Sequence, residues 1–325
     1  MRAVQVVKRV MVGVVVLLLA AMAFLAWQDR PLDARAVEGL PEIPAEWPAA
    51  RPPQGLAFSV LRTGESAGTV EALVVAGGRW FTPRRPVHSA VLIRHPQGSL
   101  LFDTGLGREV ASQFAVNGVI DREFFGYRAE EPAQAQLLRH GVAPASLMAI
   151  VPSHMHWDHI SGLPDFPDTD VWVQGAEREH AGRGRPPAFL QSQFSGVKRW
   201  RELSFEPRPY LGFAAQRDVF GDGSVVLVPL AGHTAGHVGL FLHLPSGRRY
   251  FFTGDVTWTL EGLQRPADRP WITRNAVKLD HDAPANRRAI VQIHRLMGQH
   301  PQLVVVPAHD EFVARSLPRF PQFQD

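Results

Sequence analysis

The chain of 325 residues contains no cysteine. This absence excludes a disulfide framework, a cysteine nucleophile, a thiolate zinc site, an iron–sulfur cluster and a lipidated cysteine. Low-complexity sequence is excluded too, because 28 glycines and 27 prolines are too few for it. With 45% hydrophobic residues, the chain is long and apolar enough to bury the core of one large domain or of two ordinary ones.

The sequence also has almost no excess of charge of one sign, with 34 lysine and arginine residues against 31 aspartate and glutamate residues. The formal net charge is +3, and it comes from Arg2, Lys8 and Arg9, because residues 1–27 hold no acidic residue and the remainder is balanced. A protein that binds nucleic acid through counterion release needs a basic patch, which this composition does not supply. We therefore expect no nucleic-acid partner.

Residues 10–27 form a long uncharged apolar run between the basic pair at 8–9 and Asp29. As a helix the run would be roughly 27 Å long, just enough for a bilayer core of about 30 Å. The flanking charges then place the N-terminus in the cytoplasm. We expect a single-pass anchor in a bacterial-type inner membrane, with the body on the periplasmic or extracellular side. The alternative is a signal peptide cut near Ala23, which would leave the body secreted or periplasmic.

Residues 28–55 are rich in proline, which removes backbone donors and stiffens the chain. This stretch is predicted to be a semi-extended tether between the membrane anchor or signal segment at 1–27 and a body at 56–325. An extended arm that lies on the surface of the body fits the same composition.

The body shows short β-type runs separated by glycine- and proline-bearing turns, in two blocks that each end in a helix. This order predicts an α/β protein in which two sheets pack face to face with helices outside. The expected strands are 57–62, 70–75, 89–94, 99–102, 147–152, 171–173, 224–230, 238–244, 250–253 and 304–306. The expected helices lie near 133–140 and over about 15 residues from Ala285.

The run Gly-Glu-Ser-Ala-Gly at 64–68 matches the Gly-x-Ser-x-Gly pattern of serine hydrolases. That motif needs a strand before it and a helix after it. Because a second strand is expected at 70–75, we interpret the run as a hairpin turn and not as a nucleophile.

Four side chains that can bind a metal follow the apolar strand expected at 147–152. They are His154, His156, Asp158 and His159, within the run Ser-His-Met-His-Trp-Asp-His. Packing does not account for such a cluster at the end of a strand. Neutral imidazole and carboxylate suit zinc, and also manganese or iron.

Three later segments also place a candidate ligand at the end of a predicted strand. His233 follows the strand at 224–230, Asp255 follows the strand at 250–253, and His309 follows the strand at 304–306. Each signal is weak alone. Four strand ends in order, each with a ligand, predict one metal site.

These motifs resemble those of the metallo-β-lactamase superfamily, for which the His-x-His-x-Asp-His run is specific. The resemblance covers about 270 residues, from Gly55 to the C-terminus. It implies an αββα sandwich with a dinuclear metal site in a cleft at the sheet edges, and two divalent ions per chain. The implied ligands are His154, His156 and His233 at one ion, Asp158, His159 and His309 at the other, and Asp255 as a bridge.

Two further residues match the family pattern without being expected to bind metal. Asp103, in the Asp-Thr-Gly element at 103–105, is expected to orient a ligand or the metal-binding loop. His237, the second histidine of the Gly-His-Thr-x-Gly-His run, is expected to be structural.

The resemblance implies a metal-dependent hydrolase. A water between the two ions loses its proton near neutral pH, and the resulting metal-bound hydroxide attacks an acyl or phosphoryl centre. Asp158 is placed to ligate one ion and also to take up or return the proton. Zinc is the expected metal, with manganese or iron as alternatives.

Within the superfamily, the sequence is similar to the N-acyl-homoserine lactonase-like group in the run 153–162, the run 232–237 and the final Ala-His-Asp. One position departs from that group. The lactonases commonly carry a tyrosine three residues after the bridging aspartate, where it contacts the substrate carbonyl. Here that position is Trp258, which has no ionisable hydroxyl.

Two insertions, 106–131 and 182–217, carry aromatic rings that would either form a lid over the site or pack the insertions themselves. A lid predicts an apolar or acylated small-molecule substrate. We therefore expect hydrolysis of a lactone or another carboxylic ester. The alternatives are a phosphodiesterase-type phosphoryl hydrolase that uses the same metals and a non-catalytic metal-binding module. The oligomeric state is left open.

Overall fold

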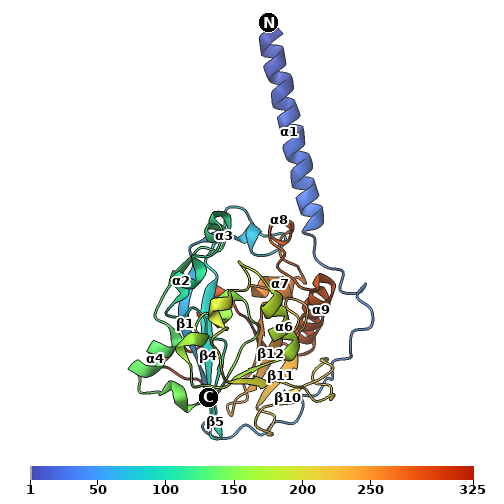
Figure 1. The fold of residues 1–325 in the computed structure, drawn as a ribbon. Coiled ribbons are helices and arrows are strands. Elements are labelled where there is room, and N and C mark those ends of the chain that lie inside the picture. The colour runs from blue at the N-terminus through green and yellow to red at the C-terminus, as the bar shows by residue number, and fades with distance from the viewer. Residues whose placement is uncertain (1) are drawn as a thin grey trace.

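The computed structural model describes residues 2–325 and contains two sheets packed face to face (Figure 1). The first sheet has the order β6-β1-β4-β5-β7-β8-β9, and the second runs from β10 to β14. The strands of the first are β1 (Ala57–Ser66), β4 (Val87–His95), β5 (Gly98–Phe102), β6 (Tyr127–Ala129), β7 (Leu147–Val151), β8 (Val171–Val173) and β9 (Trp200–Glu202). Those of the second are β10 (Arg217–Asp218), β11 (Val225–Pro229), β12 (Val238–His243), β13 (Arg249–Gly254) and β14 (Leu303–Pro307).

The central core lies between the two sheets, because side chains of a strand alternate between its faces. In β1, Phe58 and Val60 point into this core, whereas Leu61 joins a second core on the outer face. In β11, Leu227 points inward and Val226 joins a third core on the other outer face. Strands that are buried on both faces explain the nearly continuous apolar runs in the sequence.

Helices cover both outer faces, so the predicted αββα sandwich is confirmed. The first sheet is covered by α4 (Ala133–Arg139), α5 (Trp157–Ile160) and α6 (Gly175–Arg183), and the second by α7 (Leu260–Gln264) and α9 (Ala283–Gln299). Shorter helices are α2 (Val110–Phe114), α3 (Val119–Phe124), α8 (Trp271–Ala276) and α10 (Glu311–Ala314). Helix α9 begins where the Asp282 carboxylate accepts a hydrogen bond from the Ala285 N–H.

The prediction of a strand at 70–75 is wrong. Only β2 (Thr69–Val70) forms there, paired with β3 (Pro83–Arg84), and a 3₁₀ turn, Glu71–Leu73, follows. The N–H groups of Val74 and Val75 both bond to the Glu71 carbonyl, which closes a turn in place of a ladder. Ala72, Val74 and Val75 are therefore buried in a turn. The Gly-x-Ser-x-Gly run still lacks the helix that a nucleophile elbow needs.

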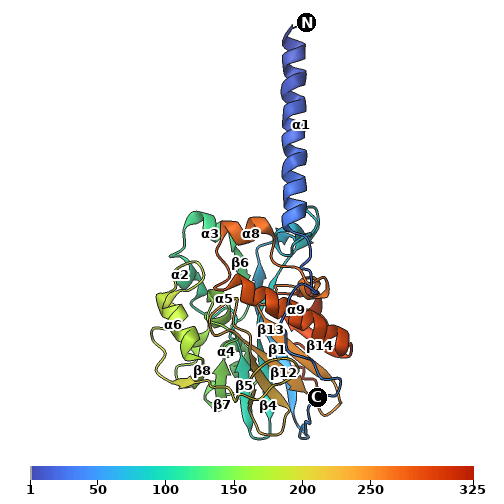
Figure 2. The ribbon, with the colours of Figure 1, turned by 90° about the vertical axis from the view of Figure 1, so that its right-hand side faces the viewer.

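Helix α1 (Arg2–Gln28) projects away from the body, as Figures 1 and 2 show from two sides. The most apolar window of 18 residues within Val4–Gln28 has a mean hydropathy of 2.7, and none of this window is buried against the protein. By length and composition, a helix of this kind fits a membrane span or a signal sequence.

Residues 28–55 lie against the body, which is the second of the two predicted forms. The Leu32 N–H donates to the Pro266 carbonyl at 2.7 Å, and the Arg51 N–H donates to the Asp222 carbonyl at 2.7 Å. The Trp47 ring lies 4.3 Å from the His300 ring, centre to centre. Together with Leu32, Trp47 packs on the core outside the second sheet. We call residues 28–55 the arm.

We predict that Trp47→Ala lowers the free energy of unfolding by about 2 kcal/mol, because a large ring is removed from the core contact of the arm. Urea unfolding of the full chain in detergent, followed by circular dichroism, measures this change. Glu46→Ala, an exposed neighbour on the same arm, is the matched control and should change stability little. Equal stability of the two variants would contradict a structural role for the arm.

Candidate metal centre

The seven predicted ligands come together at one edge of the sandwich, where several strands end. His154 and His156 follow β7, and Asp158 and His159 lie in the short helix α5. His233 precedes β12, Asp255 follows β13, and His309 follows β14. Strands β5 and β7 run parallel, as do β13 and β14, so their carboxyl ends meet at this edge.

One group of ligand atoms consists of His154, His156 and His233, whose donor atoms all lie within 4.8 Å of one another. His156 Nδ1 lies 3.0 Å from His233 Nε2. His154 Nε2 is buried and has no hydrogen-bond partner. A buried nitrogen without a partner is unfavourable unless a ligand satisfies it.

A second group gathers around one oxygen of Asp255. Asp255 Oδ1 lies 3.1 Å from His309 Nε2 and 3.3 Å from His159 Nε2. His309 Nε2 is also 3.4 Å from Asp158 Oδ2. The other oxygen, Asp255 Oδ2, lies 3.7 Å from His233 Nε2 in the first group. The two oxygens of Asp255 therefore face two different groups of ligands.

These separations fit divalent metal ions. Donor atoms at about 2.1 Å from one tetrahedral ion lie roughly 3.4 Å from one another, close to the values in the second group. The two nitrogens His159 Nε2 and His309 Nε2 approach to 3.2 Å. Imidazole nitrogens and carboxylate oxygens are also the ligands that zinc takes in hydrolases.

The electrostatics of the cluster favour metal-competent forms of several ligands. Burial, together with the neighbouring histidines, lowers the pKa of His154 and His156 well below the usual value, so both are neutral. Burial would raise the pKa of Asp255, but His309 and His159 outweigh it and hold this pKa well below its usual range. The ionised carboxylate therefore needs a cation beside it, either a protonated histidine or a metal ion.

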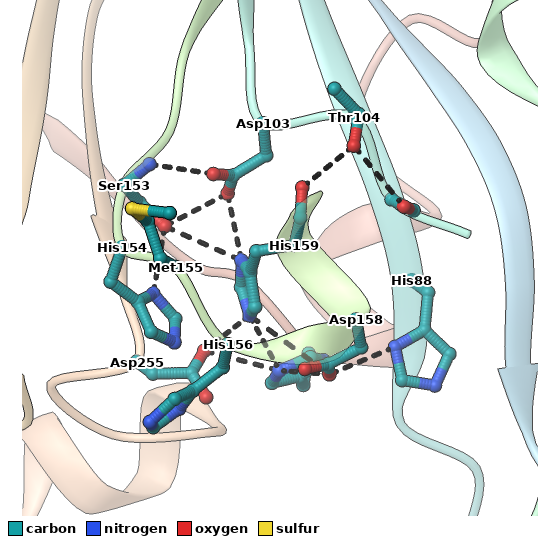
Figure 3. A network of polar contacts seen from close by, with 12 residues as sticks. His88, Asp103, Thr104, Ser153, His154, Met155, His156, Asp158, His159 and Asp255 are labelled. Carbon is teal, nitrogen blue, oxygen red and sulfur yellow. Dashed lines mark hydrogen bonds and ion pairs between the residues drawn. The ribbon is translucent and has the colours of Figure 1, made fainter. Parts of the chain in front are cut away.

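The pKa of His159 moves in the opposite direction. Burial would lower it, but the carboxylates of Asp103 and Asp255 outweigh this effect and raise the pKa well above its usual value. His159 Nδ1 lies 2.9 Å from Asp103 Oδ2, and Asp103 also accepts bonds from the Ser153 N–H at 2.6 Å and the Ser153 hydroxyl at 2.9 Å (Figure 3). Asp103 thus orients His159 and the loop after β7, as expected.

Two residues beside the cluster were missed by the sequence analysis. His88, on β4, places Nδ1 at 3.2 Å from Asp158 Oδ2. Asp280, in the loop before α9, places Oδ1 at 2.8 Å from His233 Nδ1 and at 2.8 Å from an Arg269 guanidinium nitrogen. Neither residue follows a predicted strand or belongs to a spaced motif, so no local signal in the sequence marks them.

His237 has a structural contact, in agreement with the expectation. Its Nε2 accepts a hydrogen bond from the Asp255 N–H at 3.2 Å. Burial lowers the pKa of His237 to about 3, which keeps the ring neutral and able to accept. His237 therefore supports the turn that carries Asp255.

Trp258 contacts the same carboxylate. Its indole N–H donates to Asp255 Oδ2 at 2.9 Å. The position where lactonases commonly carry tyrosine is thus occupied by a ring whose donor is engaged by Asp255. The Arg269 guanidinium lies 5.1 Å from the centre of the Trp258 ring and donates to the Asp255 carbonyl.

A cleft opens above the ligands. His156, Asp158, His233, Asp255 and His309 lie on its floor, next to His88. The walls are largely apolar and include Leu73, Val74, Phe124, Phe125, Trp157, Trp258, Val277 and Leu279. Within the described residues, no lysine or arginine lines the cleft.

Of the two arrangements expected for these rings, the lid is found for part of 106–131 and packing of the insertion is found for 182–217. Phe124 and Phe125, from 106–131, line the cleft. The insertion 182–217 contributes only Pro187 and Ala188. Its rings are buried in the cores beside the sheets, where they cover strand faces. The buried rings are Phe189, Phe194, Tyr210 and Phe213.

Residues 83–295 match the sequence model of the Metallo-beta-lactamase superfamily, and the chain therefore belongs to this superfamily. A probable metallo-hydrolase of Mycobacterium tuberculosis is 30% identical over 68% of this chain and 73% of its own length. The N-acyl homoserine lactonase AttM of Azorhizobium caulinodans is 28% identical over 72% of this chain and 86% of its own. The protein is a metal-dependent hydrolase.

Solved structures share the fold at lower identity. An N-acyl homoserine lactone hydrolase with N-hexanoyl-L-homoserine at its catalytic metal centre superposes with a TM-score of 0.65. It is 18% identical, and the match covers 82% of this chain and 98% of that chain. The dizinc lactonase AidC, at 13% identity and a TM-score of 0.53, covers 86% and 96%.

We predict that Asp280→Asn weakens metal binding by roughly 10- to 100-fold, because His233 loses the carboxylate that orients its ring. Metal content after dialysis against a graded chelator measures the affinity. Asp282→Asn is the matched control, since asparagine also caps a helix well. Metal binding by Asp280→Asn equal to that of Asp282→Asn would show that the contact with His233 has no such role.

Proposed function

We propose that the protein is a dinuclear metallohydrolase that opens a lactone, or another carboxylic ester, of an acylated small molecule. The observation that carries this proposal is the position of Asp255. Its two oxygens face two separate ligand groups at the floor of a largely apolar cleft.

In this proposal, Asp255 bridges two ions that are held by the two groups described above. His154, His156 and His233 would hold one ion, and Asp158, His159 and His309 the other. When bound, such ions polarise the oxygen of the substrate carbonyl and activate water. Zinc is the proposed metal, with manganese or iron as alternatives, and the solved structure of AidC is described as dizinc.

Asp158 is the proposed catalytic residue of the chain. The residue lines the cleft, and His88 Nδ1 lies 3.2 Å from its Oδ2. Burial would raise the pKa of Asp158, but the neighbouring histidines, first His159, lower it. An ionised carboxylate at this place can take up a proton from water and return it to the leaving oxygen.

The lining of the cleft favours a neutral acylated ester over a phosphodiester. A phosphoryl substrate carries charge that proteins commonly meet with arginine or lysine. Within the described residues, the cleft offers neither, and its walls suit an acyl chain. Curated relatives named N-acyl homoserine lactonases support the same substrate class.

The proposal predicts that the full chain in detergent, loaded with zinc or manganese, hydrolyses acyl-homoserine lactones or aryl esters faster than bis(p-nitrophenyl) phosphate. Metal analysis of the same sample and a chelator-treated aliquot are the controls. Turnover of the phosphodiester alone would replace this function with a phosphoryl hydrolase. Bound metal without hydrolysis of either class of substrate would indicate a non-catalytic metal-binding module.

We expect Asp255→Ala to lower the metal content toward one ion per chain and to abolish most of the activity, because the shared carboxylate is removed. Elemental analysis of the purified variant measures the stoichiometry. Asp170→Ala, which removes a surface carboxylate paired with Arg199 and Arg201, is the control. Two ions and full activity in Asp255→Ala would refute the bridging role.

We further propose that α1 anchors the protein in a bacterial-type inner membrane with a single pass. Its length and mean hydropathy support a span, and Lys8 and Arg9, within α1 before its uncharged apolar run 10–27, favour a cytoplasmic N-terminus. The hydrolase domain then lies on the periplasmic or extracellular side, behind the arm. Cleavage near Ala23, which would release the body, is the alternative.

A further inference from the structure

The junction between α1 and the body is short and is held by direct contacts. Helix α1 ends at Gln28, and the next residue, Asp29, accepts a hydrogen bond from the Trp271 N–H at 2.6 Å. The Phe24 ring meets the Trp271 ring edge to face, with 5.1 Å between the ring centres. Arg274 also donates to the Gln28 carbonyl at 3.3 Å. A bilayer that holds α1 must therefore touch the part of the body that carries α8.

Trp27 and Arg30, at the end of α1, have the residue types expected at a membrane surface. The Arg30 guanidinium lies 5.3 Å from the centre of the Trp27 ring. Tryptophan and arginine at the end of an apolar helix are typical of the membrane–water interface. Only one residue, Gln28, separates Trp27 from Asp29 and its bond to α8. A bilayer that held α1 would therefore bring its headgroups to the level of the end of the body that carries α8.

This end of the body includes two more segments. Figures 1 and 2 show α3 beside α8 at the end from which α1 projects. The segment 71–82 lies against the same junction: the Thr273 hydroxyl donates to the Leu73 carbonyl at 3.0 Å, and the Gly77 backbone approaches the Asp29 carbonyl. We call the segments 77–82 and 116–120 together the apolar rim.

The apolar rim holds most of the exposed large apolar side chains of the body. Among residues 28–325 as described, five belong to the rim and two, Leu138 and Phe312, lie elsewhere. The five are Trp80, Phe81, Val116, Val119 and Ile120. Phe81 is 98% exposed and Ile120 is 84% exposed. A soluble protein rarely gathers such side chains on one face unless another apolar phase covers them.

Residues that adjoin the apolar rim and α8 form part of the walls of the cleft. Phe124 ends α3, Leu73 and Val74 precede the rim segment 77–82, and Val277 and Leu279 follow α8, and all of them line the cleft. The cleft above the metal ligands therefore lies next to the apolar rim. An acyl chain that leaves the bilayer meets these apolar walls first.

We propose that the apolar rim is a membrane-docking surface, which inserts into the bilayer that holds α1, and that the substrate is a long-chain acylated ester drawn from that bilayer. The occupant of the rim is a lipid surface. Docking of the rim rests on the proposed membrane anchor α1 but not on the proposed hydrolase activity, whereas the second clause rests on both.

The docking surface is tested with single cysteines in the full chain, which has no other cysteine and is therefore labelled at one position. Ile120→Cys and Phe81→Cys, each labelled with an environment-sensitive fluorophore, are reconstituted in phosphatidylcholine–phosphatidylglycerol vesicles. We expect blue-shifted emission and quenching by lipids spin-labelled in the acyl chain. Gln97→Cys, at the exposed turn between β4 and β5 far from α1, is the control and should be quenched by aqueous iodide instead.

Two results would overturn the docking surface. One is iodide quenching at positions 81 and 120 equal to that at position 97. The other is efficient disulfide cross-linking between two copies of Ile120→Cys in vesicles without quenching by the labelled lipids, which would assign the rim to a second copy of the chain.

The substrate clause is tested with Ile120→Glu, whose side chain lies outside the cleft. We expect KM for a long-chain acyl lactone in vesicles to rise about tenfold, with kcat unchanged, because a charge replaces one inserted apolar group. Turnover of a short-chain, water-soluble lactone should stay the same. Equal KM values for the long-chain substrate in both proteins would refute entry from the bilayer. Lipid quenching without hydrolysis of any lactone would refute the proposed function and leave the docking surface standing.

Discussion

The arrangement of the site depends on one buried carboxylate, Asp255, which is nearly inaccessible to solvent and faces imidazoles on both sides. An ionised group in such a place is unfavourable unless positive charge and hydrogen bonds compensate for its loss of water. The surroundings supply both. Trp258 donates to one oxygen, and Arg269 donates to the backbone carbonyl of the same residue. The cluster is therefore an electrostatic unit in which each part is stabilised only in the presence of the others.

The backbone around this carboxylate is equally constrained. Gly254 has a φ of +51°, and a Cβ at this position would collide with His237 Nε2. Glycine is thus required at the turn after β13, where the chain must bend sharply between two sheets. On the opposite sheet, Asp103 has a φ of +59° and holds the loop after β7 through Ser153. Both sheets place their functional turns at the same edge, with backbone conformations that suit few residues.

Much of the fold and the ligand set was predictable because the signals are local. Apolar runs such as Leu147–Val151 define strands, and a histidine or aspartate directly after a strand must lie at a sheet edge. The contacts of His88 and Asp280 join residues that are far apart in the sequence. Asp280 meets His233 across 47 residues of sequence, and nothing in either neighbourhood encodes this distance.

The error at 70–75 and the open choice at 182–217 follow from the same limit. The residues 70–75 have the composition of a strand, yet they form a turn because Val75 and Ala76 are buried against Ala267, far along the chain. For the rings of 182–217, the sequence fits a lid and a packed insertion alike, because both need aromatic residues. Phe189 and Tyr210 cover the outer faces of different sheets. Burial by distant partners decides such cases, and local pattern does not report it.

The arm has a consequence for how the molecule is made. The contact of Asp29 with Trp271 spans 242 residues, and that of Pro44 with His300 spans 256. The arm is synthesised before the rest of the body. It therefore makes these two contacts only when almost the whole sequence has been translated. Contacts of such long sequence separation form late and slow the folding of a domain. If the body is exported behind α1, the outer face of the second sheet stays uncovered until α9 has crossed the membrane. The last step of folding then coincides with the end of translocation.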